Sequence, residues 1–301
     1  MSSGPLTPGT YRPPVVRSSP IEPSWNGGYR LGPPPPVIRK PRIWLHILLF
    51  ALTVWTTSAF GAVYSVCLMS ILTAHEFGHY FAARYHRVQA SLPYFIPLPA
   101  QVSLFGTLGA VIRMSPHIPN RRALFDIASA GPIAGLVIAL PVAFIGVATS
   151  EYRTPDLEGS FILGDPLMFT VMEWIISGGR PEGTDLYLNE MAYAGWVGLF
   201  VTSLNLLPIG QLDGGHVIYA VFAAKSRFVA ATAFVGLALV TIFMSPAYIL
   251  FVILLWFFRI KHPPTMNDFI LLDRPRRIVA AGLLLVFILC FTPVPIVKMP
   301  F

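Results

Sequence analysis

Two histidines and a glutamate interrupt an apolar stretch of the sequence, in the segment ILTAHEFGHYFAARYH that covers residues 71 to 86. His75 and His79 are four positions apart, so on a helix their side chains project from one face, one turn above the other. This spacing lets two imidazoles bind one zinc ion, and Glu76 beside them can take a proton from zinc-bound water. The segment therefore predicts zinc ligands at His75 and His79 and a general base at Glu76.

A packing role is the alternative for these polar residues. A single polar residue in a membrane span is usually a hydrogen-bonded packing residue, but each ionisable group in lipid needs a partner or a function. Three such groups within five positions favour a functional site. Catalytic zinc typically takes three protein ligands, so a third ligand must come from elsewhere in the chain. Asp213 is the candidate, because it is an acid within the otherwise uncharged run 191–224.

The run 191–224 is too long for one membrane crossing, and Pro208 and the pair Gly214–Gly215 interrupt it. Broken backbone at membrane depth is tolerated only where protein or water satisfies its polar groups. The break therefore marks a polar site. Counted along regular helices, His75 lies about 14 Å from the basic boundary of its span, and the break reaches a similar depth from the other side. Asp213 is thus placed to be the third ligand.

The composition sets the fold class. The chain of 301 residues is 54% hydrophobic and only 12% charged, and its mean hydropathy is +0.65. Soluble domains have about 25% charged residues. We therefore expect an all-α polytopic membrane protein with about six to seven transmembrane helices. The long apolar runs, nearly free of charge, that could form them are 43–61, 62–85, 123–148, 191–224, 228–244, 247–258 and 278–297.

The charges between these runs predict an orientation. Residues 150–190 hold eight acidic residues against two arginines, whereas the other connecting segments are basic. By the positive-inside rule the N-terminus is cytoplasmic and residues 150–190 face outward. The net charge of +7 is thus an orientation signal, and we expect lipid contacts but no nucleic-acid partner. The expected location is a bacterial inner (plasma) membrane, and the oligomeric state is left open.

Three regions follow from these patterns. Residues 1–41 carry eleven prolines, and we expect a disordered, Pro-rich cytoplasmic tail that cannot bury a core. This tail lacks the apolar segment of a cleaved signal peptide, so the first span is expected to be retained. Residues 42–225 are expected to form the catalytic membrane core with the zinc site. Residues 226–301 are expected to form C-terminal transmembrane helices.

Four motifs occur in order along the chain. They are HEFGH (75–79), FGTLGAVIRM (105–114), SAGPIAG (129–135) and the pattern Asn205…Pro208…Leu212-Asp213-Gly214. The first and last resemble the two signature motifs of the site-2 protease family of intramembrane zinc metalloproteases. The third is similar to that family's glycine-proline motif, and the second resembles the re-entrant hairpin of the branch found in cyanobacteria and plastids. The likeness covers roughly residues 43 to 225.

The resemblance implies an activity and a set of roles. It implies one zinc ion held by His75, His79 and Asp213, with Glu76 as a catalytic residue. Asn205 would hold the substrate or the tetrahedral intermediate, although a helix–helix hydrogen bond is the alternative role for it. The implied reaction is hydrolysis of a peptide bond within the transmembrane segment of a single-pass membrane protein, as in regulated intramembrane proteolysis.

Residues 102–112 alternate loosely around two glycines, which favours a short re-entrant β-hairpin near residues 100–114. An exposed edge there would pair with an unwound substrate by strand addition. An inert interfacial loop is the alternative. The expected substrate-binding residues are Phe105, Gly106, Thr107, Gly109 and Asn205.

The chain departs from many family members, which carry a PDZ domain in the outward loop or a CBS pair at the C-terminus. Residues 150–190 are too few for a PDZ domain, and nothing soluble of useful size follows Val297, so we expect the branch without either domain. The rival class is a proton- or metal-coupled membrane transporter with intramembrane His, Glu and Asp. It explains the broken run but not why a glutamate directly follows the first histidine. A catalytically inactive zinc-binding membrane protein is a third possibility.

Overall fold

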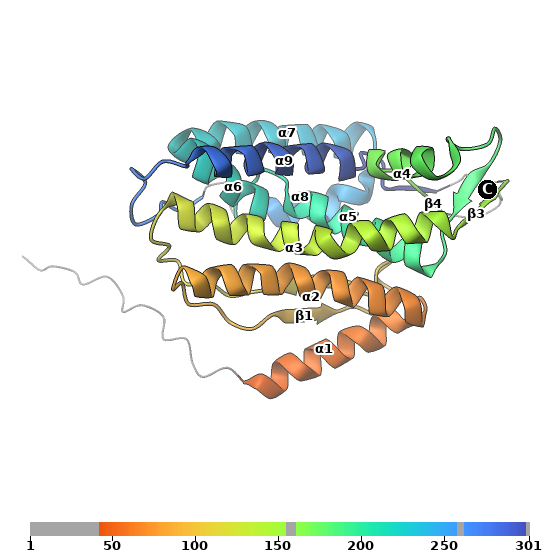
Figure 1. Ribbon diagram of the computed structural model, residues 1–301, viewed down its shortest axis with the longest axis horizontal. Helices are drawn as coiled ribbons and strands as arrows, with labels where there is room; N and C mark the ends of the chain where they lie inside the picture. Colours follow the sequence, from red (N-terminus) through yellow and green to blue (C-terminus); the bar gives the residue numbers. More distant parts are fainter. Residues whose placement is uncertain (1–41, 155–160, 258–261, 299–301) are drawn as a thin grey trace, which may run out of the picture. The chain divides into compact units, whose positions relative to one another are not determined.

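The structure is a computed structural model that describes residues 42–154, 161–257 and 262–298, and these residues are mostly helical (Figure 1). The tail expected at residues 1–41 lies outside the described residues. The helices are α1 (Ile43–Ser58), α2 (Ala62–Tyr85), α3 (Arg121–Ala148), α4 (Leu167–Ser177), α5 (Glu190–Asn205), α6 (Asp213–Phe222), α7 (Ser226–Phe243), α8 (Ile249–Phe257) and α9 (Arg274–Cys290), with the 3₁₀ turns η1 (Ala223–Lys225) and η2 (Pro246–Tyr248) before α7 and α8.

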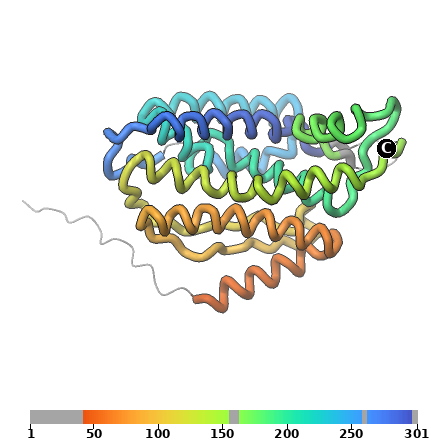
Figure 2. The backbone as a smooth tube through the Cα atoms, in the orientation of Figure 1, coloured from red at the N-terminus to blue at the C-terminus, as the bar shows by residue number. Residues whose placement is uncertain are grey.

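The predicted apolar runs coincide closely with helices. A turn at residues 59–61 separates α1 from α2, as the sequence suggested, and Figure 2 follows the chain through it. The long run 191–224 is broken into α5 and α6. Among the described residues, two helical segments are long and apolar enough to cross a membrane, Arg121–Ala148 and Asp213–Phe243. The count of six to seven spans therefore stays a prediction, because most of the other apolar helices are too short.

Small sheets correct the all-α prediction. Three two-stranded antiparallel sheets occur among the described residues. They are β1 (Tyr94–Pro97) with β2 (Thr107–Val111), β3 (Glu151–Arg153) with β5 (Asp185–Tyr187), and β4 (Phe161–Leu163) with β6 (Ile296–Lys298). The expected hairpin is therefore present, but its first strand begins before residue 100. Its prolines hid that strand from sequence reasoning, since proline is confined to strand edges and bulges, and the pairing is indeed irregular between Phe95 and Pro97.

Helix α3 packs between α2 on one side and α5 and α6 on the other (Figure 1). Small residues permit this close packing, as is usual between membrane helices. A β-carbon on Gly78 of α2 would lie within 3 Å of the backbone of Ala130 on α3, and one on Gly195 of α5 would overlap Ala143. The helices that carry the predicted site residues are therefore held against one central helix.

Candidate metal centre

The structure brings the three predicted zinc ligands together. The Nε2 atoms of His75 and His79 are 3.2 Å apart, and they lie 3.2 Å and 3.3 Å from Oδ2 of Asp213. Tetrahedral zinc with bonds of about 2.0–2.1 Å to imidazole and carboxylate separates its ligand atoms by about 3.3–3.4 Å. Both histidines are buried. The triangle of donor atoms therefore fits one zinc ion and leaves room for a fourth ligand.

Local structure explains why Asp213 reaches the two histidines. The chain breaks after α5, and Asp213 is the first residue of α6. The loop before it folds back tightly, because β-carbons on Gly214 and Gly215 would overlap the carbonyl oxygens of Leu206 and Gly210. The glycines that interrupted the apolar run thus let the loop pack against the start of the helix that presents the carboxylate.

Helix α3 packs against both histidines of the site. The Nδ1 atom of His79 lies 2.7 Å from the carbonyl oxygen of Ile127, and since a carbonyl only accepts, Nδ1 carries the proton. Nε2 then keeps its lone pair for a metal. A β-carbon on Gly131 would overlap the His79 ring, and one on Gly135 would lie 3.2 Å from the His75 side chain. The SAGPIAG motif is therefore needed for space beside the ligands.

Glu76 and Asn205 also lie at the site. Glu76 is buried on α2 directly after the first ligand. The Nδ2 atom of Asn205, the last residue of α5, lies 3.3 Å from Nε2 of His75. A carboxylate beside a metal site can move a proton, and an amide donor can bind a developing negative charge. The geometry is compatible with both predicted roles, which stay predictions.

Two of the predicted substrate-binding residues of the hairpin, Phe105 and Thr107, have side chains that pack against the rest of the protein. Phe105 packs near Trp196 and Phe200, with ring centroids 6.4 Å and 6.0 Å away. Thr107 is buried and donates a hydrogen bond to the carbonyl of Ile96. The hairpin therefore turns these two side chains into the protein. Substrate binding by Phe105, Gly106, Thr107 and Gly109 stays a prediction.

Sequence reasoning missed the surroundings of His216. Its Nδ1 atom is within hydrogen-bond reach of Nε2 of His262, which lies 46 positions away and gave no signal in the sequence. A cavity of about 240 Å³ lies beside the broken segment, and Pro208, Gly215 and His262 are among its lining residues. Sequence spacing also did not predict the carbonyl of Ile127 as a partner of His79. Contacts between distant segments form only when the chain folds.

Comparisons with known proteins agree with this geometry. The sequence profile described as Peptidase family M50 matches residues 63–244, a range that includes all three predicted ligands. The "Probable zinc metalloprotease EGY1, chloroplastic" of Oryza sativa subsp. japonica is 28% identical over 252 residues, which cover 79% of this chain and 41% of that protein. The "Probable zinc metalloprotease EGY2, chloroplastic" of Oryza sativa subsp. indica is 27% identical over 204 residues, 65% of this chain and 36% of that protein. The chain thus spans well under half the length of these relatives, and no solved structure matches it.

Proposed function

The chain belongs to peptidase family M50, a family of membrane zinc metalloproteases, and we propose that it hydrolyses a peptide bond within the transmembrane segment of a membrane-tethered substrate. The observation that carries the proposal is the convergence of His75, His79 and Asp213 on one point beside the buried Glu76. The helices around that point are apolar. A membrane-spanning peptide is therefore the substrate class that would reach it.

The chain's own residues divide the chemistry among them. A bound zinc ion would polarise the substrate carbonyl and lower the pKa of water. Glu76 accepts the proton of the attacking water and returns it to the leaving amine nitrogen. The amide of Asn205 donates a hydrogen bond to the oxygen on which negative charge develops.

The site's depth predicts the position of the cut. On regular helices the ligands lie about 14 Å from the basic boundary of the membrane, so the bond should be cut in the cytoplasmic half of the substrate's span. The expected product is a cytoplasmic fragment with several apolar residues attached, and the expected partner is a single-pass membrane protein. Such a cut would serve regulated intramembrane proteolysis.

The location of this membrane is part of the proposal. Sequence analysis expected a bacterial inner membrane, whereas the names of the relatives place those proteins in the chloroplast. We propose that the chain is an integral, multi-pass membrane protein whose basic side, including the N-terminus, faces the cytoplasmic compartment.

Cleavage in reconstituted liposomes tests the proposal against a transporter. The assay uses a single-pass test substrate and compares the wild type with Glu76→Gln. We expect the wild type to cut the substrate and Glu76→Gln to lose at least about 100-fold in rate while it keeps its zinc. Mass spectrometry of both product termini locates the cut. Near-normal turnover in Glu76→Gln, cuts only in the outward half, or metal or proton flux without any cleavage would contradict it.

A further inference from the structure

The tip of the β1–β2 hairpin is held by hydroxyl groups from three different helices. Three consecutive backbone carbonyls of the tip each accept a hydrogen bond from a side-chain hydroxyl, and the third also accepts one from the backbone N–H of Leu98 (3.2 Å). The pairs are Tyr193 on α5 with Leu104, Tyr64 on α2 with Phe105 (2.9 Å), and Thr56 on α1 with Gly106 (2.7 Å). We call Thr56, Tyr64 and Tyr193 the tip clamp. Each hydroxyl is 41 or more positions from the carbonyl that it binds, so only the fold brings the pairs together.

The tip clamp is tightly built. Tyr64 is fully buried, and its ring stacks on that of Tyr193 with centroids 5.0 Å apart. Gly106 has a φ of +73°, and a β-carbon there would lie 2.9 Å from the backbone of Thr56. A backbone carbonyl at membrane depth needs a partner. The hydroxyls of Tyr193 and Tyr64 supply that partner at the first two positions of the tip. At Gly106 the Thr56 hydroxyl adds to the backbone N–H of Leu98, and together these bonds fix the conformation of the tip.

The helices behind the tip clamp are themselves tied together. Oε2 of Glu190, in the first turn of α5, accepts hydrogen bonds from the backbone N–H groups of Val63 and Tyr64 (2.9 Å and 3.3 Å). A β-carbon on Gly61 would overlap this carboxylate. The carboxylate therefore caps the start of α2, where anions are stabilised, and joins the helix that carries Glu76 to the helix that carries Asn205.

We propose that the tip clamp positions the hairpin for substrate, an inference that rests on the proposed function. The tip clamp occupies the carbonyls of the tip, and strand β2 offers substrate the side chains of Leu108 and Val111, which are 64% and 50% exposed. The clamp fixes the height of this strand relative to α2 and α5. Thr56, Tyr64 and Tyr193 are positioning residues, because they touch the hairpin and not the reacting atoms.

Removal of the hydroxyls tests the inference. The double variant Tyr64→Phe/Tyr193→Phe, in the liposome assay, should raise KM about tenfold, since each lost hydrogen bond is worth roughly a factor of two to ten. Its kcat should change less than twofold and its zinc content should not change. Hydrogen–deuterium exchange of residues 107–111 should become faster, because the tip is no longer held. Tyr152→Phe, which removes a hydroxyl bound to Ser177 far along the chain from the hairpin, should change neither KM nor this exchange.

A conservative pair separates positioning from folding. Thr56→Val should raise KM, whereas Thr56→Ser keeps the hydroxyl and should retain the wild-type KM. The inference is overturned if the wild type cleaves normally but the hydroxyl-free variants show unchanged KM, or if they lose kcat or zinc instead. A wild type that cuts no substrate overturns the proposed function itself. The exchange measurement does not depend on cleavage. Unchanged exchange of residues 107–111 in the hydroxyl-free variants would therefore overturn the positioning role of the tip clamp even if the wild type cuts no substrate.

Discussion

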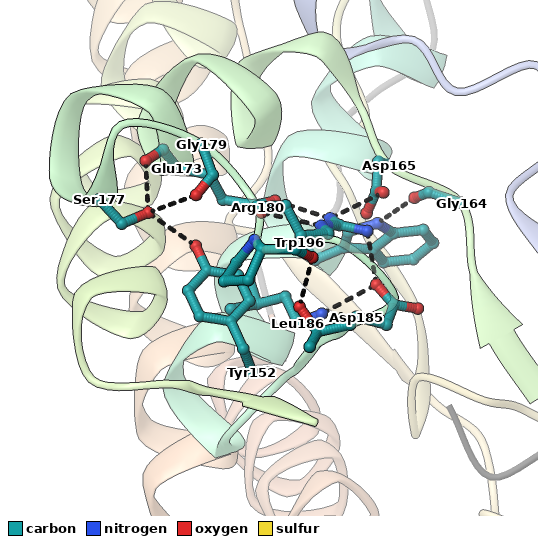
Figure 3. Close-up of polar contacts among 12 residues, drawn as sticks. Tyr152, Gly164, Asp165, Glu173, Ser177, Gly179, Arg180, Asp185, Leu186 and Trp196 are labelled. Carbon is teal, nitrogen blue, oxygen red and sulfur yellow. Dashed lines mark hydrogen bonds and ion pairs between the residues drawn. The ribbon is translucent and has the colours of Figure 1, made fainter. Parts of the chain in front are cut away.

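Two clusters of ionisable side chains in this molecule are built on opposite principles. In the metal centre, the Nε2 atoms of His75 and His79 and a carboxylate oxygen of Asp213 face one another at 3.2–3.3 Å. We call the segment between α3 and α5, which carries α4 and β5, the cap. In the cap, Arg180 lies among three carboxylates (Figure 3). Its guanidinium nitrogens are 2.8 Å from Glu173, 2.6 Å from Asp185 and 2.9 Å from Asp165.

The two clusters differ in whether a protein cation pairs with the carboxylates, and this property helps to recognise a metal site. In the cap a protein cation satisfies the acids, and its hydrogen bonds to Glu173 help to raise the pKa of Arg180 above its ordinary value. In the metal centre no lysine or arginine pairs with Asp213 anywhere in the described part of the chain. A buried carboxylate and two imidazoles that converge without a lysine or arginine are suited to a cation from outside. The first cluster is thus suited to a metal, and the second to holding a loop in place.

The largest expected effect is the loss of the anionic ligand. Asp213→Asn keeps the shape of the side chain but leaves two neutral imidazoles to hold a divalent ion in a low dielectric. Zinc affinity and cleavage should each fall by more than about 100-fold, which exceeds the usual effect of residues that only support a ligand. Dialysis against a mild chelator followed by metal analysis measures the affinity. Full occupancy after dialysis would mean that the third ligand lies elsewhere.

Removal of the cation from the cap should produce the next largest effect. Arg180→Met leaves the buried Glu173 without its partner, and breaking such a pair costs about 3–5 kcal/mol. Exchange of the backbone amides of β5 and α4 should become much faster, while zinc content stays at the wild-type level. Arg153→Met, which breaks an exposed pair with Glu151 and a cation–π contact with the Tyr187 ring, is the control and should leave the exchange of α4 unchanged. Zinc loss in Arg180→Met would show that the two clusters are coupled.

Crowding of one ligand should produce a smaller effect on metal binding. Gly131→Ala places a β-carbon where the His79 ring lies, and the shifted imidazole should weaken zinc binding about 10- to 100-fold. Gly236→Ala on α7 adds a β-carbon that meets nothing within 4 Å, and it serves as the matched control. A competition titration with a zinc chelator gives both affinities. Equal zinc affinities in the two variants would show that the packing of α3 against His79 does not affect metal binding.

The smallest expected effect is a pH dependence of the cap. Burial raises the pKa of Asp165, and Asp185 and Glu173 add to the rise although Arg180 opposes it. A carboxyl whose pKa is higher in the folded state stabilises the fold below its unfolded-state pKa, and this contribution is lost as pH rises through the folded-state value.

Water screens the half-exposed Asp165 side chain, so this contribution should be under about 1 kcal/mol. Amide exchange of the cap, measured at several pH values and corrected for intrinsic exchange rates, should show slightly higher stability in mild acid. Asp165→Asn should flatten that dependence. A cap whose stability rises with pH, and does so equally in both proteins, would contradict the assignment.

Local patterns sufficed to predict which three side chains converge and where most helices lie. The spacing of His75 and His79 needs only the helical period, and the interrupted run pointed to Asp213 because charge is costly in lipid. Helix α4 was missed, since its acidic surroundings suggested a solvated loop. A signal was nevertheless present, because Pro166 precedes the helix and Gly178 ends it in a left-handed conformation, a pattern typical of helix boundaries.

Contacts across the fold escaped prediction for a physical reason. The carbonyl of Ile127 that orients His79 belongs to the backbone, which every residue has, so no residue type marks it. The tip clamp likewise uses ordinary hydroxyls, and Tyr193 is 89 positions from its partner Leu104. Sequence spacing indicates which side chains share a face of one helix. It does not indicate which faces of separate helices meet.

The zinc content of the purified protein tests the central claim most directly. Each protein is loaded with zinc, dialysed and analysed for metal per chain, as the wild type, Glu76→Gln, His75→Ala and His79→Ala. We expect about one zinc ion per chain in the wild type and in Glu76→Gln, and almost none in either histidine variant, because catalytic zinc relies on its three protein ligands. A wild type that holds no zinc, or a histidine variant that keeps it, would contradict the account.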